Sequence, residues 1–218
     1  WRGHLENLLS SPKKTKKVEH HPALPWREVG AFMQELRTMP GTAALATEFI
    51  ILTNCRTSEA IEARWSEIDT VEKRWTIPAA RMKAAKEHTI PLSDAALAVL
   101  QRLKAETKEG EFVFPGGKKN TPLSNMACLA LLKRMGRSDL TVHGFRSSFR
   151  DWAGEATAHP REVIEHAMSH QLKDKAEAAY QRGSLLERRR VLMADWANYC
   201  AQPTVTGVVV ALHSTKSA

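Results

Sequence analysis

The chain has 218 residues, of which 43% are hydrophobic and 26% charged, and it carries a net charge of +8 with a pI near 9.6. This length and ordinary composition predict one well-buried core, with room for a short appendage, and no apolar stretch is long enough to span a membrane. The positive balance favours a nucleic-acid partner, although a basic protein that binds no nucleic acid can carry the same charge.

The three cysteines, Cys55, Cys128 and Cys200, form no CxxC pair and have no metal-site spacing. A reducing, cytoplasmic setting is therefore expected, with Cys55 as a small buried apolar residue. The first residues, WRGH, include no hydrophobic signal region and no initiator Met, so we expect a fragment of a longer protein without a signal peptide.

Residues 1–25 have the composition of a polar linker that cannot pack by itself. They are either a solvated tail or a basic strap across a DNA backbone. The candidate DNA-binding lysines of this strap are Lys13, Lys14, Lys16 and Lys17. His20 and His21 are adjacent but have no further ligands nearby in the sequence, so no metal site is predicted.

The folded part is expected to begin near Pro25. Apolar residues at helical spacing predict a helix from Trp26 to Leu36, which Pro40 and Gly41 end. A largely apolar helix follows over residues 42–53, and a short third helix is predicted from Ser58 to Arg64.

After this helix, apolar residues alternate with polar ones. Two strands are predicted at Arg74–Pro78 and His88–Pro91, joined by the polar hairpin tip RMKAAKE, and Glu67–Val71 is a candidate for the first strand of this sheet. Ser93 is expected to cap a helix over 94–106.

An extended segment is predicted at 112–117. Further helices are expected at 123–136, 144–156, 160–168, 174–181 and 184–200. Residues 207–212, GVVVAL, are β-prone but have no hairpin partner. The predicted fold is therefore mainly α-helical with a small antiparallel β-sheet, a mixed α+β domain.

Two short motifs contain arginines that could bind an anion. Arg56 precedes Glu59 by three residues, which alone indicates an ordinary surface ion pair on a helix. His143 and Arg146 also lie three apart at a helix start, where both side chains and the helix N-terminus can face one anion. Their alternative interpretation is a capping histidine beside a solvated arginine.

Five sequence segments, read in order, resemble the catalytic boxes of the tyrosine recombinases, and most of all a phage or prophage integrase. The segments are TNCRTSEA, RMKAAKEHTIPLS, TVHGFRSSFRDW, AMSHQ and AEAAYQR. The resemblance covers about residues 27–200. It implies a catalytic set of Arg56, Lys83, His143, Arg146, His170 and Tyr180, with Glu59 supporting Arg56. The other tyrosine, Tyr199, is expected to be a packing residue.

The resemblance implies a role for each of these residues. Tyr180 would attack the scissile phosphate, and a lysine on the hairpin would protonate the leaving 5′ oxygen. Lys83 fits that place better than Lys86, which remains the alternative and is otherwise expected to bind DNA with the linker lysines. The arginines and His170 would bind the phosphate, and His143 would accept the tyrosine proton.

The expected protein is a site-specific DNA recombinase that needs no metal and no other cofactor. Its expected partners are double-stranded DNA attachment sites, a homo-tetramer on DNA, and accessory DNA-bending or excision proteins. A prophage remnant that binds DNA without catalysis is the alternative, and excision, inversion or strand relaxation are other outcomes of the same chemistry. A metal-dependent nuclease is disfavoured because no carboxylate cluster is apparent.

The resemblance to the tyrosine recombinases implies three regions of the chain. Residues 1–25 would be the end of a missing core-binding domain and a basic linker, 26–202 the catalytic domain, and 203–218 a tail. In related integrases a C-terminal segment packs on a neighbouring protomer, so GVVVAL is expected to add a strand in trans.

Overall fold

The computed structural model describes residues 22–106, 110–170 and 185–202. The linker lysines, the helix predicted at 174–181 with Tyr180, and the tail strand predicted at 207–212 lie outside these ranges.

The first described elements are helical, as predicted. A 3-10 turn, η1 (Trp26–Glu28), leads into α3 (Val29–Thr38), and α4 (Thr42–Thr53) follows. Helix α4 is buried on nearly every face, which agrees with an apolar sequence that has no polar stripe. The third helix, α5 (Thr57–Ile61), is shorter than predicted. Its predicted continuation to Arg64 is wrong because Arg64 forms an isolated β-bridge with Phe112, after which the chain enters a second 3-10 turn, η2 (Trp65–Glu67).

A three-stranded antiparallel sheet follows in the order β1-β2-β3. It consists of β1 (Ile68–Asp69), β2 (Arg74–Ile77) and β3 (His88–Pro91), with Trp75 of β2 opposite Ile90 of β3. Trp75 and Ile77 are fully buried while their neighbours are half-buried, as the alternating sequence predicts. The turn η3 (Ala79–Arg81) begins the connection from β2 to β3.

The remaining described elements are helices: α6 (Asp94–Glu106), α7 (Ala127–Arg134), α8 (Gly144–Ala156), α9 (Arg161–Ala167) and α11 (Leu186–Ala201). Their bounds confirm the predictions for 94–106 and 144–156. Helix α7 starts four residues later than the predicted 123, because the chain around Pro115 and Pro122 forms an isolated β-bridge instead. The hydroxyl of Ser93 accepts a hydrogen bond from the Ala96 amide at 3.3 Å, which confirms the predicted cap.

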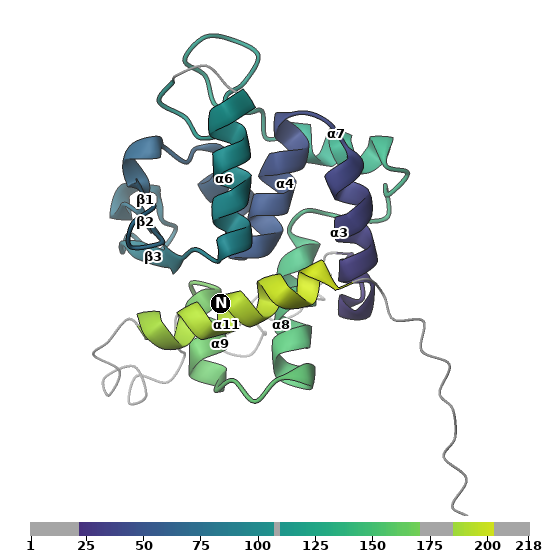
Figure 1. Ribbon diagram of the computed structural model, residues 1–218, viewed down its shortest axis with the longest axis vertical. Coiled ribbons are helices and arrows are strands. Elements are labelled where there is room, and N and C mark those ends of the chain that lie inside the picture. Colours follow the sequence, from purple (N-terminus) through teal and green to yellow (C-terminus); the bar gives the residue numbers. More distant parts are fainter. Residues whose placement is uncertain (1–21, 107–109, 171–184, 203–218) are drawn as a thin grey trace, which may run out of the picture.

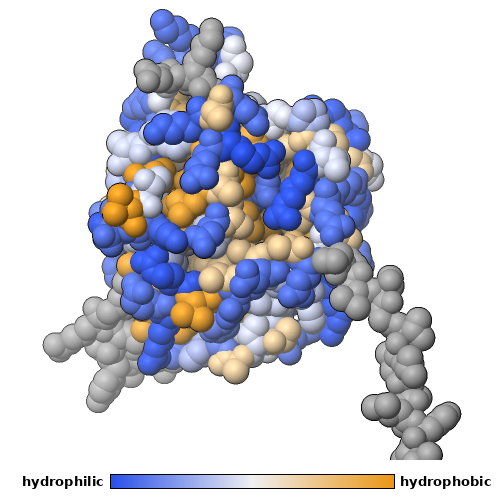
Figure 2. Space-filling model, in the orientation of Figure 1, coloured by the Kyte–Doolittle hydropathy of each residue, from blue (hydrophilic) through white to orange (hydrophobic). Residues whose placement is uncertain are grey.

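Helix α11 joins the two parts of the molecule (Figure 1). The sheet, α6, α4 and α3 lie on one side of it, and α8 and α9 lie on the other. It contacts α3, α4, α6, α9 and β3. Hydrophilic residues cover most of the face in Figure 2, and apolar residues are visible mainly near its middle. Among the described helices, none has the length and apolar character needed to cross a bilayer.

Candidate active site

Arg56 and Glu59 are held together at the start of α5. The Glu59 carboxylate accepts one hydrogen bond from the Arg56 amide at 2.8 Å and another from its guanidinium at 2.7 Å. The bond to the Arg56 amide caps the start of α5, because the carboxylate satisfies a backbone donor that has no partner within the helix. The Glu59 side chain is 3% exposed and that of Arg56 is 25% exposed, so the carboxylate is buried while the guanidinium keeps access to solvent. The simple surface ion pair is therefore excluded by the burial of Glu59.

Arg146 lies in the first turn of α8 and connects two loops. Its guanidinium donates one hydrogen bond to the Asn54 carbonyl and another, at 2.6 Å, to the Met168 carbonyl. Asn54 lies two residues before Arg56, and Met168 lies two residues before His170. A single buried side chain thus fixes the loops that carry two other predicted site residues.

The two arginines are also close enough to affect each other electrostatically. Burial, and then the charge of Arg56, lower the pKa of Arg146 from 12.5 to about 10, while Glu59 acts in the opposite direction. Arg146 remains protonated at neutral pH. Two guanidiniums beside one buried carboxylate leave a net positive site, which suits a phosphate that accepts paired hydrogen bonds.

The two predicted histidines lie near Arg146 in the chain or in the turn that it holds. His143 is the exposed residue just before α8, about one helical turn ahead of Arg146. His170 follows α9 and the left-handed residue Ser169, and its Nδ1 lies 2.7 Å from a carboxylate oxygen of Glu165. That contact orients the imidazole ring. Arg146, through its bond to Met168, holds this turn beside the arginine pair.

The two candidate lysines lie in the connection between η3 and β3. Lys83 and Lys86 are both exposed, and Met82, directly before Lys83, is buried. The Ala85 amide donates to the Met82 carbonyl at 2.9 Å, and Ala85 has a positive φ of 49°, so the tip turns sharply between the two lysines. The structure therefore places Lys83 next to an apolar anchor and Lys86 beyond the turn.

His88, the first residue of β3, lies near the site but is not among the residues predicted from the sequence. Burial, followed by the charges of Arg189 and Arg56, lowers the pKa of His88 from 6.5 to about 3. Its Nε2 is buried and accepts or donates no hydrogen bond within the described ranges. The only sequence signal was its place at the end of the hairpin motif. His88 is thus a neutral, half-buried imidazole beside the cationic site.

Arg189, in the first part of α11, is a second residue near the site that no sequence motif predicted. It is 2% exposed and donates a hydrogen bond to the Thr89 carbonyl at 2.7 Å. Burial lowers its pKa to about 10. The arginine attaches the start of α11, which follows the undescribed residues 171–184, to strand β3.

The structure thus brings Arg56, Glu59 and Arg146 together, joins the turn before His170 to Arg146 through the Met168 carbonyl, and places His143 one helical turn before Arg146. Tyr180 and the linker lysines fall outside the described residues. Over residues 22–106, 110–170 and 185–202, no group of three or more His, Cys, Asp or Glu side chains is arranged to hold a metal ion.

Comparison with known proteins agrees with this architecture. The phage integrase family matches residues 23–184. The chain is similar to the prophage integrase IntA of Escherichia coli K12, with 38% identity over 214 residues, covering 96% of this chain and 51% of that protein. It is also similar to the integrase of Enterobacteria phage P4, with 33% identity over 210 residues, covering 88% of this chain and 48% of the relative.

Among solved structures, the fold resembles that of a lambda integrase tetramer bound to a Holliday junction. The TM-score is 0.56 at 20% sequence identity, and the match covers 81% of this chain and 54% of the lambda chain. The chain spans about half the length of the curated relatives it matches. Because the family match extends over most of the sequence, this chain belongs to the phage integrase family.

Proposed function

We propose that the chain is the catalytic part of a site-specific DNA recombinase that cuts and rejoins strands through Tyr180. The observation that carries the proposal is the Arg146 side chain, which links the Arg56 loop to the His170 turn. In the resulting cationic site Arg146 and Glu59 are buried and Arg56 is held by Glu59, and fixed positive charge is what a phosphoryl transition state requires.

The proposed reaction begins with attack of the Tyr180 oxygen on the scissile phosphorus. The bond from phosphorus to the 5′ oxygen breaks, and a 3′-phosphotyrosyl bond forms. His143 accepts the tyrosine proton, and Lys83 gives a proton to the leaving 5′ oxygen. Arg56, Arg146 and His170 bind the non-bridging oxygens.

A 5′ hydroxyl from a partner strand then reverses the step and releases Tyr180. The covalent intermediate conserves the energy of the phosphodiester, so the proposed cycle balances without ATP or a metal ion. This second transfer distinguishes a recombinase from a nuclease.

We further propose double-stranded DNA attachment sites as substrate and a homo-tetramer as the active assembly. The similar lambda integrase was solved as a tetramer on a Holliday junction, which supports this assembly. In the proposed division of the chain, the lysines of residues 1–25 contact phosphates, 26–202 catalyse, and the tail 203–218 contacts a neighbouring protomer. Excision and DNA-bending proteins would be the accessory partners.

The first test compares the wild-type chain with Tyr180→Phe in plasmid relaxation and covalent-adduct assays in the presence of EDTA. We expect Tyr180→Phe to lose both relaxation and the labelled adduct while its DNA affinity stays nearly unchanged. Tyr199→Phe is the matched control, because the chain has only two tyrosines. The Tyr199 hydroxyl donates to the Trp26 carbonyl at 3.1 Å, so its loss should cost about 1 kcal/mol of stability and leave cleavage intact.

Relaxation that survives in Tyr180→Phe would contradict the proposal. If the wild type binds DNA but forms no adduct, even within its full-length protein, the alternative of a non-catalytic DNA-binding remnant holds.

A further inference from the structure

Arg81, two residues before Lys83, is clamped by groups from two other elements, η2 and α5. One of its terminal nitrogens lies 2.5 Å from each carboxylate oxygen of Glu67. The other donates to the backbone carbonyl of Glu59 at 2.5 Å. The Arg81 side chain is 14% exposed, so these contacts are largely shielded from water.

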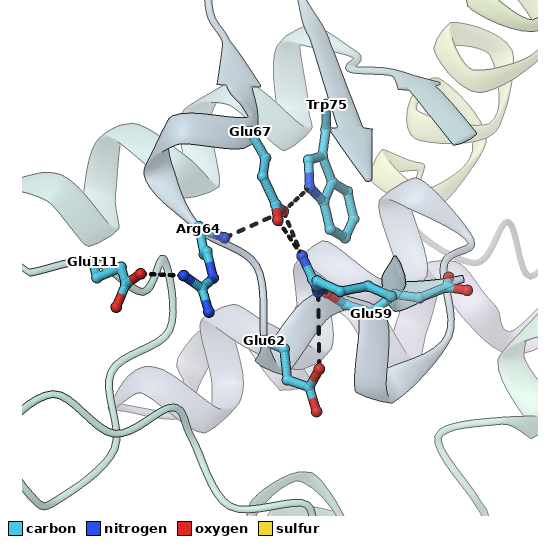
Figure 3. Close-up of polar contacts among 7 residues, drawn as sticks. Glu59, Glu62, Arg64, Glu67, Trp75 and Glu111 are labelled. Atoms are coloured by element: carbon cyan, nitrogen blue, oxygen red, sulfur yellow. Dashed lines mark hydrogen bonds and ion pairs between the residues drawn. The ribbon is translucent and has the colours of Figure 1, made fainter. Parts of the chain in front are cut away.

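Glu67 is itself fixed on the sheet side of this clamp. Its side chain is 8% exposed, and it accepts hydrogen bonds from the Trp75 indole at 2.9 Å and from the Arg64 amide at 3.3 Å. Trp75 is fully buried in β2. Figure 3 shows Glu67 between Trp75 and the main chain of Arg64, with Glu59 on the far side of the network. The carboxylate therefore has little freedom to follow Arg81 if the hairpin moves.

The other contact of the clamp leads to the phosphate site. The Glu59 carbonyl accepts from Arg81, while the Glu59 carboxylate holds both the amide and the guanidinium of Arg56. One residue thus contacts the base of the hairpin and the phosphate-binding arginine. The path from Lys83 to Arg56 is Met82, which is buried, then Arg81, then Glu59.

We propose that Arg81 is a positioning residue for the proposed strand cleavage, which holds Lys83 in place relative to the phosphate bound by Arg56. The inference rests on the proposed function. A general acid must lie within hydrogen-bond reach of the leaving oxygen. Lys83 is exposed on a polar tip, so contacts at the base of the hairpin must hold its main chain in place. A displacement of the acid by about 1 Å can lower the rate on the order of 100-fold.

A merely stabilising ion pair would also be expected to slow the reaction when it is broken, so the test must separate the two roles. Cleavage is measured on two DNA substrates, one with the normal 5′-bridging oxygen and one with a 5′-bridging sulfur. The sulfur leaving group needs no acid. A defect in acid positioning therefore affects the oxygen substrate alone, whereas damage to Arg56 or to the fold affects both.

The main variant is Arg81→Lys, which keeps the charge but cannot reach Glu67 and the Glu59 carbonyl with a planar fork. We expect cleavage of the oxygen substrate to fall by about 10- to 100-fold and that of the sulfur substrate to fall by less than about threefold. In the double variant with Lys83→Ala, the Arg81 change should add no further loss on the oxygen substrate.

Two companion variants keep the test decisive. Glu67→Gln weakens the clamp from the sheet side without altering the hairpin sequence, and it should give the same oxygen-specific loss if Arg81→Lys fails to fold. Arg64→Lys is the matched control, since the Arg64 guanidinium pairs with Glu111 in an exposed position and contributes only its backbone amide to Glu67. It should cleave both substrates at the wild-type rate.

Equal slowing of both substrates by Arg81→Lys and Glu67→Gln would overturn the inference. An active Tyr180→Phe would instead overturn the proposed function beneath it. If sulfur rescues Lys86→Ala and not Lys83→Ala, the acid is Lys86, and the stated role of Arg81 toward Lys83 is wrong.

Discussion

At the scale of single residues, the site is built from charged groups whose burial is matched by specific partners. Arg146 satisfies backbone carbonyls, Glu59 satisfies Arg56, and Arg189 satisfies the Thr89 carbonyl. A buried charge is costly unless such partners are present, so each pairing also fixes a position. The imidazole of His88 is an exception, because its buried Nε2 has no hydrogen-bond partner among the described residues.

This exception predicts a pH dependence of stability. The pKa of His88 is lowered from 6.5 to about 3 in the folded protein, because burial and the nearby arginines disfavour the charged form. Its neutral form is therefore favoured by folding. The stabilisation is fully present above pH 6.5 and is lost progressively as the pH falls toward 3.

The measurement is the urea unfolding free energy at pH 7.5 and at pH 4.5 for the wild type and His88→Gln. The glutamine variant cannot take up a proton, so its free energy should fall less between the two pH values. If the unfolding free energy of both proteins falls by the same amount, protonation of His88 is not the cause of the pH dependence.

At the scale of elements, the entry to α8 depends on a close approach of two backbone segments. A Cβ placed on Gly144 would lie 2.1 Å from the Pro22 carbonyl oxygen, far inside contact distance. Gly144 is next to His143 and two residues before Arg146, so the chain entering the domain packs against the turn that positions both side chains. Only glycine fits there without moving one segment.

Gly144→Ala should therefore destabilise the domain by about 1–3 kcal/mol and weaken phosphate-dependent DNA binding. Gly154→Ala is the matched control in the same helix, because a Cβ there meets no atom within 4 Å. The control should be neutral or stabilise the protein by up to about 1 kcal/mol. Thermal unfolding and DNA titration measure both effects, and a Gly144→Ala protein with wild-type stability would contradict the packing argument.

At the scale of the whole molecule, α11 unites the two groups of elements seen in Figure 1. The fully buried Trp196 contacts Phe149 of α8 edge-on, and its indole donates to the Ile51 carbonyl at 2.8 Å. Ile51 lies in the last turn of α4, where carbonyls have no partner within the helix. One side chain thus connects α11 to both groups of elements, which favours a single cooperative unfolding unit.

Trp196→Phe should lower the unfolding free energy by about 2–3 kcal/mol, because it removes buried surface and leaves the Ile51 carbonyl unpaired. Trp26→Phe is the control, since the Trp26 indole donates to an exposed carboxylate of Glu155, and its loss should cost less than about 1 kcal/mol. Circular dichroism and tryptophan fluorescence should report one coincident transition in both variants. Two separate transitions would show that α11 does not couple the two parts.

Much of the fold could be predicted because local patterns and tertiary packing agree. The alternation around Trp75 predicts a strand, and the uniformly apolar run of α4 predicts a buried helix; both are confirmed. The errors occur at ends, where long-range contacts decide. Helix α5 stops early because Ala63, Arg64 and Trp65 pair with the distant residues 111–113, which the local sequence around Arg64 does not reveal.

The sequence by itself determined the family and the order of the candidate residues, because both follow from ordered motifs that can be recognised in the sequence alone. Only the tertiary structure decided that Arg146 binds the loops of Arg56 and His170, that His88 lies half-buried beside them, and that Arg81 connects the hairpin to Glu59. The physical reason is that these contacts join residues distant in the chain, and many of them end on backbone carbonyls. A carbonyl is present at every position, so no residue pattern marks which one a buried side chain will select.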